Sequence, residues 1–270
     1  MNAVCPAHRT SGEISAVGRA VQLLTQFRTA GRATLGAAEL ARRTGLPKAT
    51  VHRILLELVR VGLLDRVGTG FRPGLLLFEL GALVPQQRDL REAARRHMAV
   101  LHEATRHHVG LAVLRGADVV YVEIMRSPGA PRLPQRSGGR WPAHASCSGK
   151  AMLAFAAPEA VERVLAEPLR SLTSRTISEA EDLCTELDRV RRAGVAFDRR
   201  ESFPDVAGVA APVLGADGEV LAALSVSGAA GRINLRRLDV AVRTSALAIT
   251  RDLAAAESMV APVLGGPASR

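Results

Sequence analysis

The segment "RRTGLPKATVHRILLEL", residues 42–58, decides the fold of the N-terminal part of the chain. It holds a glycine turn between two short helical patterns. Gly45 stands where a helix C-cap favours a left-handed residue, and Pro47 suits the first turn of a new helix. Apolar residues then recur at helical spacing and predict a helix buried along one side: Val51, Ile54, Leu55, Leu58 and Val59.

Polar side chains occupy the opposite side of this expected helix, near its N-terminal end. In a helix-turn-helix protein, that end of the second helix contacts base edges in the major groove of DNA. Arginine and histidine can donate to guanine, and lysine can reach a phosphate. The residues expected at this surface are Lys48, Ala49, Thr50, His52 and Arg53. Because an ordinary solvated helix face has the same appearance, the flanking sequence has to decide between the two interpretations.

The flanking sequence favours a winged helix-turn-helix. An apolar repeat predicts a helix that begins after Ser15 as N-cap and ends at Gly31, and a second helix is expected over 36–43. Residues 62–74, "GLLDRVGTGFRPG", predict two short strands around a hairpin tip at residues 68–70, which would form the wing. Four arginines at the edge of this surface are expected near phosphates: Arg42, Arg43, Arg66 and Arg72.

The distribution of charge supports DNA binding more than its total does. The chain of 270 residues has a net charge of +10, but 34 of its 36 basic residues are arginine, which is a compositional bias. Through residue 72 there are 11 basic and 4 acidic residues, a net charge of +7, whereas the other 198 residues contribute only +3. A positive N-terminal quarter is what a phosphate-binding domain requires.

Several other classes of protein are disfavoured. No apolar run approaches the roughly 18 to 20 residues that cross a bilayer, and residues 1–14 lack the apolar stretch of a secretory signal, so we expect a cytoplasmic protein without a membrane partner. Cys5, Cys147 and Cys184 form no disulfide or zinc pattern and are expected as reduced thiols. The histidines at 102, 107 and 108 lack zinc spacing and are expected on a wet helix face. We predict no metal, no cofactor and no catalytic residue.

The remaining chain predicts a linker and a second domain of α+β class. Residues 75–84, "LLLFELGALV", are apolar on several faces and predict a helix that packs on a domain or on a second subunit. From Val109 the apolar period becomes two, and residues 109–125 and 208–228 each predict a pair of strands. Helices expected between 148 and 193, and again over 234–257, would cover an antiparallel sheet. The expected domains are 14–74 for DNA binding, 75–96 as linker helix region, 97–258 for effector binding and 259–270 as a disordered tail.

Three features predict a ligand site in this second domain. The stretch 142–155, "PAHASCSGKAMLAF", places Cys147 and Ser148 at the start of an apolar helix, where free backbone N–H groups attract an anion. Ser225 and Ser227 share one side of an apolar strand and would face a pocket, and Asp198 could accept from a ligand hydroxyl. A helix cap, a solvated strand face and a turn would explain the same residues without a ligand. A phosphate-binding P-loop does not fit, because Ala151 follows Gly149-Lys150.

Together these segments resemble the IclR family of bacterial transcription regulators over about residues 14–256. The most specific matches are "GLPKATVHRILLEL", "PAHASCSGKA" and the final strand pair. The resemblance implies a GAF-like effector domain, a homodimer or dimer of dimers, double-stranded operator DNA as partner and a small organic or aromatic acid as effector. It places the effector at Cys147, Ser148, Asp198, Ser225 and Ser227. The sequence departs from the family pattern at Cys147, Ser148, Arg199, Arg200 and Gly208, which leaves the effector open.

We therefore predict a ligand-responsive transcriptional regulator, expected to repress. The alternative is a metabolite-binding enzyme that uses Cys147 and His144 for chemistry and its N-terminal helices only for assembly.

Overall fold

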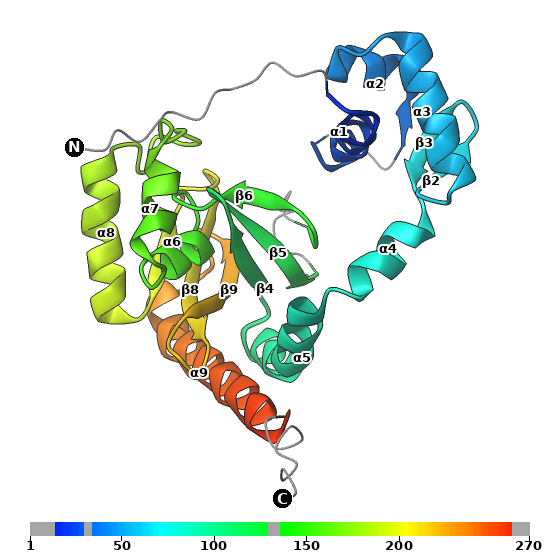
Figure 1. The fold of residues 1–270 in the computed structure, drawn as a ribbon. Helices are drawn as coiled ribbons and strands as arrows, with labels where there is room; N and C mark the ends of the chain where they lie inside the picture. The colour runs from blue at the N-terminus through cyan, green and yellow to red at the C-terminus, as the bar shows by residue number, and fades with distance from the viewer. Residues whose placement is uncertain (1–13, 30–33, 129–135, 261–270) are drawn as a thin grey trace, which may run out of the picture. The chain divides into compact units, whose positions relative to one another are not determined.

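The computed structural model describes residues 14–29, 34–128 and 136–260 (Figure 1). The chain divides into two compact units, residues 1–84 and 85–270. The division lies inside the expected linker region 75–96, between Val84 and Pro85. Cys5, Gly31 and the part of the expected tail after Val260 lie outside the described residues.

Unit 1 contains the helix-turn-helix. Its helices α1 (Ala16–Thr29), α2 (Ala37–Thr44) and α3 (Lys48–Arg60) match the three expected from the sequence. Ser15 caps α1, since its Oγ accepts a hydrogen bond from Gly18 N at 3.1 Å. Gly45 has φ 71° and donates its N–H to Ala41 O, as the C-cap of α2 requires. Pro47 immediately precedes α3 instead of occupying its first turn.

The wing of unit 1 is a three-stranded sheet. Strands β2 (Leu64–Val67) and β3 (Gly70–Pro73) form the expected hairpin. A third strand, β1 (Leu35–Gly36), pairs with β3 and was not predicted, because two residues are too short to show a period. Leu23, Leu40, Leu55 and Phe71 meet in the core between the helices and this sheet.

Two successive helices occupy the segment that joins the units. α4 (Leu75–Ala82) has no buried residue, and Phe78 on it is 71% exposed. The next helix, α5 (Pro85–Thr105), begins at a proline, which suits the first turn of a helix. The apolar side chains of α4 are therefore not buried by any other described part of this chain.

Unit 2 is built on one antiparallel sheet of six strands. The expected pairs are present as β4 (His108–Arg115) with β5 (Asp118–Met125), and β8 (Val206–Leu214) with β9 (Val220–Ala229). Two short strands were not predicted: β6 (Arg140–Pro142) and β7 (Ala196–Arg199). The order β6-β5-β4-β9-β8-β7 places β4 and β9 side by side at the centre. The predicted α+β class is confirmed.

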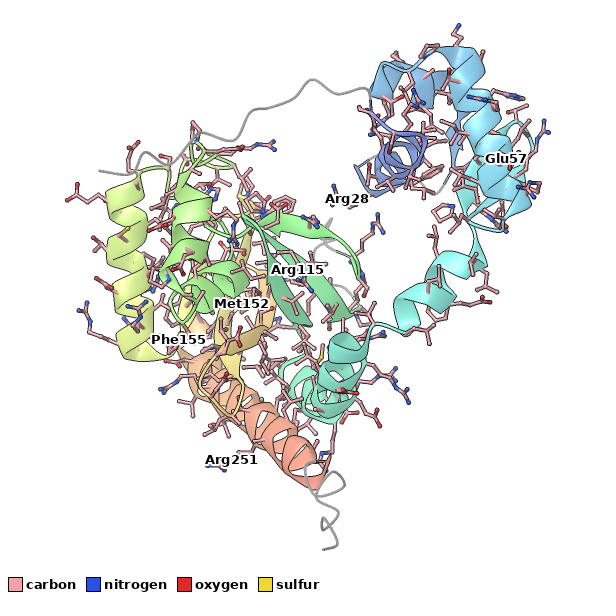
Figure 2. The ribbon with its side chains drawn as sticks, viewed as in Figure 1. Arg28, Glu57, Arg115, Met152, Phe155 and Arg251 are labelled. Atoms are coloured by element: carbon pink, nitrogen blue, oxygen red, sulfur yellow. The ribbon has the colours of Figure 1, made fainter. Side chains whose placement is uncertain are left out.

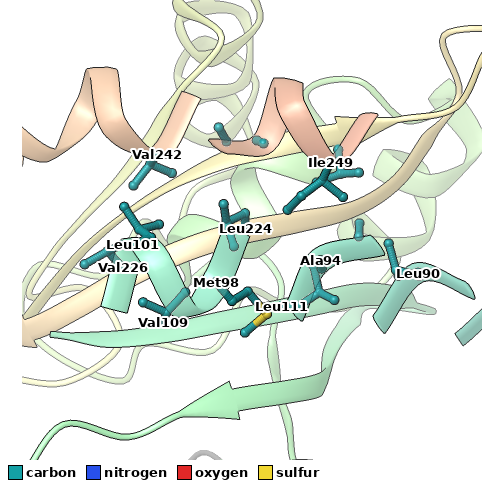
Figure 3. Packing of buried hydrophobic residues seen from close by; sticks show 14 of the residues in the cluster. Leu90, Ala94, Met98, Leu101, Val109, Leu111, Leu224, Val226, Val242 and Ile249 are labelled. Atoms are coloured by element: carbon teal, nitrogen blue, oxygen red, sulfur yellow. The ribbon is translucent and has the colours of Figure 1, made fainter. Parts of the chain in front are cut away.

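Helices cover both faces of this sheet, as Figure 1 shows. α5 and α9 (Leu235–Val260) pack on one face, where Met98, Leu111, Leu224 and Ile249 meet (Figure 3). On the other face lie α6 (Cys147–Leu153), α7 (Pro158–Leu165) and α8 (Ala180–Ala193). Met152 of α6 is buried there, and Phe155 packs against the same cluster (Figure 2). Alternate residues of each strand thus face two separate cores. No helix in the described ranges is long and apolar enough to cross a membrane.

Candidate functional site

The outer face of α3 in unit 1 carries the residues expected to contact DNA. Val51, Leu55 and Leu58 are buried on the inner side. Lys48, Ala49, His52 and Arg53 are exposed on the outer side and Thr50 is half-buried at its flank. The helix therefore presents one small and four polar side chains at the end that enters the major groove in helix-turn-helix proteins.

The basic residues around this face differ in their partners. Arg43 forms an ion pair with Glu39 at 2.9 Å, and Arg72 forms one with Asp65 at 3.1 Å. Lys48, Arg53, Arg42 and Arg66 have no side-chain partner among the described residues. They are free to contact DNA without first breaking a protein contact.

The two wing arginines also lie on different sides of the hairpin. Arg72 is opposite Asp65 in the β2–β3 pair, whereas Arg66 is opposite the buried Phe71. Since successive residues of a strand point to opposite faces, Arg66 and Arg72 leave the hairpin on opposite faces.

In unit 2 the structure brings the predicted ligand residues to one face of the sheet. The strand register aligns Asp198, Gly208, Ser227 and His108 in a row across β7, β8, β9 and β4. Ser225 lies opposite Gly110 one step along, on the same face. This is the face that α6 covers, so Cys147 and Ser148, at the start of α6, lie over the same part of the sheet.

Two glycines make room for larger side chains in this cluster. A Cβ atom at Gly208 would lie 3.1 Å from Cys147 Sγ, and one at Gly110 would lie 3.1 Å from Tyr121 Cε1. Such distances are tighter than ordinary van der Waals contact. Cys147 and Tyr121 therefore occupy the space that side chains at these two strand positions would fill.

The space left between β4, β5 and β9 is a cavity of about 20 Å³, which is room for about one water molecule. It is lined by His108, Gly110, Tyr121, Ile124, Arg126, Ser225 and Ser227. Ser225 and Ser227 thus line the cavity as expected. Cys147, Ser148 and Asp198 lie nearby but are buried in the surrounding packing and do not line it.

The start of α6 is partly used by the protein itself. Ser146 is the N-cap, and its Oγ accepts a hydrogen bond from the N–H of Gly149 at 3.0 Å. The sequence suggested free N–H groups at this helix start, but this one is already bound within the protein. Gly149 is required because a Cβ atom there would lie 2.1 Å from Ala143 O. The fully buried Ser148 Oγ has no hydrogen bond of good geometry among the described residues, although it lies near the Tyr121 hydroxyl. Burial raises the pKa of Tyr121 well above its usual value, and the nearby Ser148 hydroxyl offsets only part of that rise.

Asp198 is held by the turn that follows β7. Its carboxylate accepts from Glu201 N at 2.7 Å and from the Ser202 hydroxyl. Burial nevertheless raises the pKa of Asp198 to about 6. This carboxyl group orders the turn, and a ligand hydroxyl would have to compete with those contacts.

A buried ion pair lies behind the cluster and was missed by the sequence interpretation. Lys150 on α6 is fully buried, and its Nζ contacts Glu201 and, at 3.3 Å, Glu186 on α8. Burial alone would raise the pKa of Glu186, but hydrogen bonding from Arg189 and the charge of Lys150 outweigh burial and lower it. No local signal predicts this pair, because the carboxylates come from positions 36 and 51 residues away.

The enzyme alternative lacks its catalytic pair. His144 Nε2 contacts Arg170 O at 3.1 Å, and no hydrogen bond joins it to Cys147 within the described ranges. Burial raises the pKa of the Cys147 thiol well above its usual value, so the nucleophilic thiolate is scarce at neutral pH.

The expectation for the histidines was wrong at two positions. His107 lies after the end of α5, in the bend before β4, and is half-buried. His108 is not on a wet helix face; it is the buried first residue of β4, where its Nδ1 accepts from Ser127 N at 3.1 Å. With Tyr121 and Arg126 it is a cavity-lining residue that sequence reasoning missed. The expected strand began at Val109, whereas β4 begins one residue earlier, at His108. Extending the alternating pattern by one residue would have placed His108 in the strand. In the part of the chain that the structure describes, no three His, Cys, Asp or Glu side chains form a metal site.

A winged helix-turn-helix joined to a sheet-and-helix unit with a small polar cavity defines a class, the ligand-responsive DNA-binding regulators. The chain belongs to the IclR family of bacterial transcriptional regulators. Residues 16–68 match the IclR helix-turn-helix domain, and residues 82–253 match the bacterial transcriptional regulator IclR C-terminal domain. The resemblance noted from the sequence is thereby confirmed.

Individual relatives agree with this assignment. The chain is 32% identical to the HTH-type transcriptional regulator BhcR of Paracoccus denitrificans over 84% of this chain and 82% of that protein. It is 29% identical to the transcriptional repressor IclR of Escherichia coli over 83% of each. Among solved structures, an IclR homolog from Microbacterium hydrocarbonoxydans complexed with 4-hydroxybenzoate has a TM-score of 0.82 and 33% identity, covering 89% of this chain and all of that one.

Proposed function

We propose that this regulator binds operator DNA through the N-terminal half of α3. The observation that carries the proposal is the division of α3 into a buried apolar side and an exposed side with Lys48, Thr50, His52 and Arg53. His52 and Arg53 would donate to base edges, and Lys48 would contact a phosphate. Operator DNA also implies that the protein acts in the bacterial cytoplasm.

The phosphate contacts are proposed to come from the arginines beside α3. Arg42 and Arg66 are available at once. Arg43 and Arg72 would have to exchange a carboxylate for a phosphate, because each is already paired. We therefore assign the larger share of phosphate binding to Arg42 and Arg66.

The effector is proposed to be a small organic acid that binds on the α6 face of unit 2. His108 and Arg126 would meet its carboxylate, and the hydroxyls of Ser225 and Ser227 would orient it. The cavity holds about one water molecule, so an acid would have to displace lining side chains such as Tyr121. The 4-hydroxybenzoate bound to the Microbacterium homolog supports an acid as the ligand class.

The small size of this cavity suggests how the effector acts on DNA binding. An acid that fits only the opened form of unit 2 shifts the population toward that form. We propose that the change reaches unit 1 through residues 75–96, which join the two units in the chain. The regulator is proposed to repress, as the name of the Escherichia coli relative suggests.

The protein is proposed to act as a homodimer or a dimer of dimers. α4 exposes Leu75, Phe78 and Leu80, and α1 exposes Val17 and Val21. Apolar side chains on helices of this kind favour contact with a second subunit.

The test is a titration of the purified protein with its own upstream DNA and with scrambled DNA of equal length, each at 50 and about 200 mM salt. We expect a preference for the upstream DNA that persists at the higher salt. Equal affinities that fall together as salt rises would leave only non-specific electrostatic binding.

A further inference from the structure

A second, larger hollow of unit 2 lies away from the proposed effector site. It measures about 720 Å³ and lies between β7, the turn after β9 and the first turn of α9. Phe197 and Arg199 of β7 line it. Asp198, between them, points to the other face of the sheet. The hollow is therefore separate from the effector cavity, although both use β7.

Three arginines line this hollow: Arg199, Arg232 and Arg236. None of the three has an ion-pair partner among the described residues. The one carboxylate in the lining, Asp239, is already paired with Arg243 at 2.7 Å. The hollow thus concentrates about three uncompensated positive charges.

Arg199 is also restrained in position. Its guanidinium lies 4.6 Å from the centroid of the Phe197 ring. Stacking of this kind uses the flat face of the guanidinium and leaves its N–H groups in the plane available to an acceptor. Less side-chain freedom is therefore lost when an anion binds.

The size and charge of the hollow indicate the class of ligand. Pockets for small molecules have volumes of about 300–1,000 Å³, and this hollow falls within that range. Guanidinium groups bind carboxylates and phosphates in bidentate fashion. A monocarboxylate offers one such group, whereas three arginines can engage two or three.

We propose that this hollow is a second binding site of unit 2, and that it takes a small anion with at least two negative charges on carboxylate or phosphate groups. The proposal does not depend on the identity of the effector in the first site.

The experiment is isothermal titration calorimetry of the full chain with citrate and with pyrophosphate, and with acetate at matched ionic strength as a monovalent reference. The test variant is Arg232→Gln/Arg236→Gln. The matched control is Arg237→Gln, which removes an exposed arginine of the same helix that lies outside the lining and has no ion-pair partner among the described residues.

We expect citrate, pyrophosphate or both to bind the wild type saturably, and acetate not to bind. Whichever of the two binds identifies carboxylate or phosphate as the preferred group. The double variant should bind about 10-fold more weakly or worse, because two charge-assisted contacts are lost, while Arg237→Gln stays within about 2-fold of the wild type. All residues changed are exposed, so the thermal midpoints without anion should agree.

Three results would overturn the proposal. One is the absence of saturable binding to the wild type. Another is unchanged binding by the double variant, which would place the anion elsewhere, such as on the basic surface of unit 1. The third is an equal loss in Arg237→Gln, which would reduce the effect to diffuse electrostatics.

Discussion

Replacing Lys150 with Met should destabilise unit 2 far more than the loss of any exposed charge. The Lys150 side chain is fully buried, and its ammonium contacts Glu201, which is itself buried, and Glu186. Without Lys150, Glu186 keeps its ion pair with Arg189 at 2.7 Å. Glu201 has no other cation among the described residues. A buried charge left alone in this way costs about 3–5 kcal/mol.

A double variant makes the magnitude testable. Lys150→Met/Glu201→Gln removes the isolated charge and keeps an acceptor for the Arg199 N–H that Glu201 Oε1 binds at 3.2 Å. We expect it to recover about 1–3 kcal/mol relative to Lys150→Met. The control Arg140→Met removes a half-exposed partner of Asp118, which should cost at most about 1 kcal/mol.

The assay is urea denaturation at pH 7 followed by tryptophan fluorescence. Trp141 is the only tryptophan of the chain, and it lies on β6 of unit 2, stacked on Phe203 with ring centroids 4.4 Å apart. The signal therefore reports on the unit that contains Lys150. A loss below about 1 kcal/mol for Lys150→Met, or a double variant no more stable than the single one, would refute the reasoning.

Three further predictions concern the two proposed sites. Gly208→Ala should cost about 1–3 kcal/mol of stability through the contact with Cys147 Sγ. Adding Cys147→Ala should recover part of that cost in the same urea assay. Equal costs with and without Cys147→Ala would show that Cys147 does not fill the space beside Gly208. The folded-state pKa of Asp198 is raised to about 6 from 3.8, so the folded protein keeps that proton at a pH where the unfolded chain has lost it. The free energy of unfolding should therefore decrease as the pH rises from about 4 to 6, and by more in the wild type than in Asp198→Asn. Parallel curves would show that Asp198 titrates normally. Arg53→Ala should weaken binding to the upstream DNA by about 1–3 kcal/mol with little effect on scrambled DNA, whereas an equal loss on both DNAs would make Arg53 a phosphate contact.

Unit 1 could be predicted almost completely from the sequence. Its helices are long enough to show a 3.6-residue period, and Ser15 and Gly45 mark ends by local hydrogen bonding and backbone conformation. The exception is β1, whose two residues form a strand only because β3 offers an edge.

In unit 2 the long strands were predictable and the contacts between distant segments were not. Alternation located the β8–β9 pair and placed Ser225 and Ser227 correctly on the cavity side. β6 and β7 are three and four residues long, too short to show a period of two, and they are defined by pairing with β5 and β8. The cavity is formed by residues of three strands, so Tyr121 and Arg126 become recognisable as its lining only when the register is known.

The same reason explains the residues whose environment differed from expectation. Whether Cys147 and Asp198 face a ligand or the protein depends on Gly208 and on the turn at residues 199–202, and neither contact has a sequence signature. The burial of Lys150 likewise depends on two carboxylates that the fold supplies.

The central claim is that one chain recognises a DNA sequence and changes its affinity when a small acid binds. The most direct measurement is fluorescence anisotropy of labelled upstream DNA, titrated with the full-length protein at fixed salt, without ligand and with each member of a panel of small carboxylic acids. We predict that one class of acid changes the affinity by about 5–150-fold, the range of typical allosteric coupling, and that Ser225→Ala/Ser227→Ala reduces this change while leaving ligand-free DNA binding intact. An affinity for upstream DNA that no acid alters, or a response that the serine variant retains in full, would contradict the account.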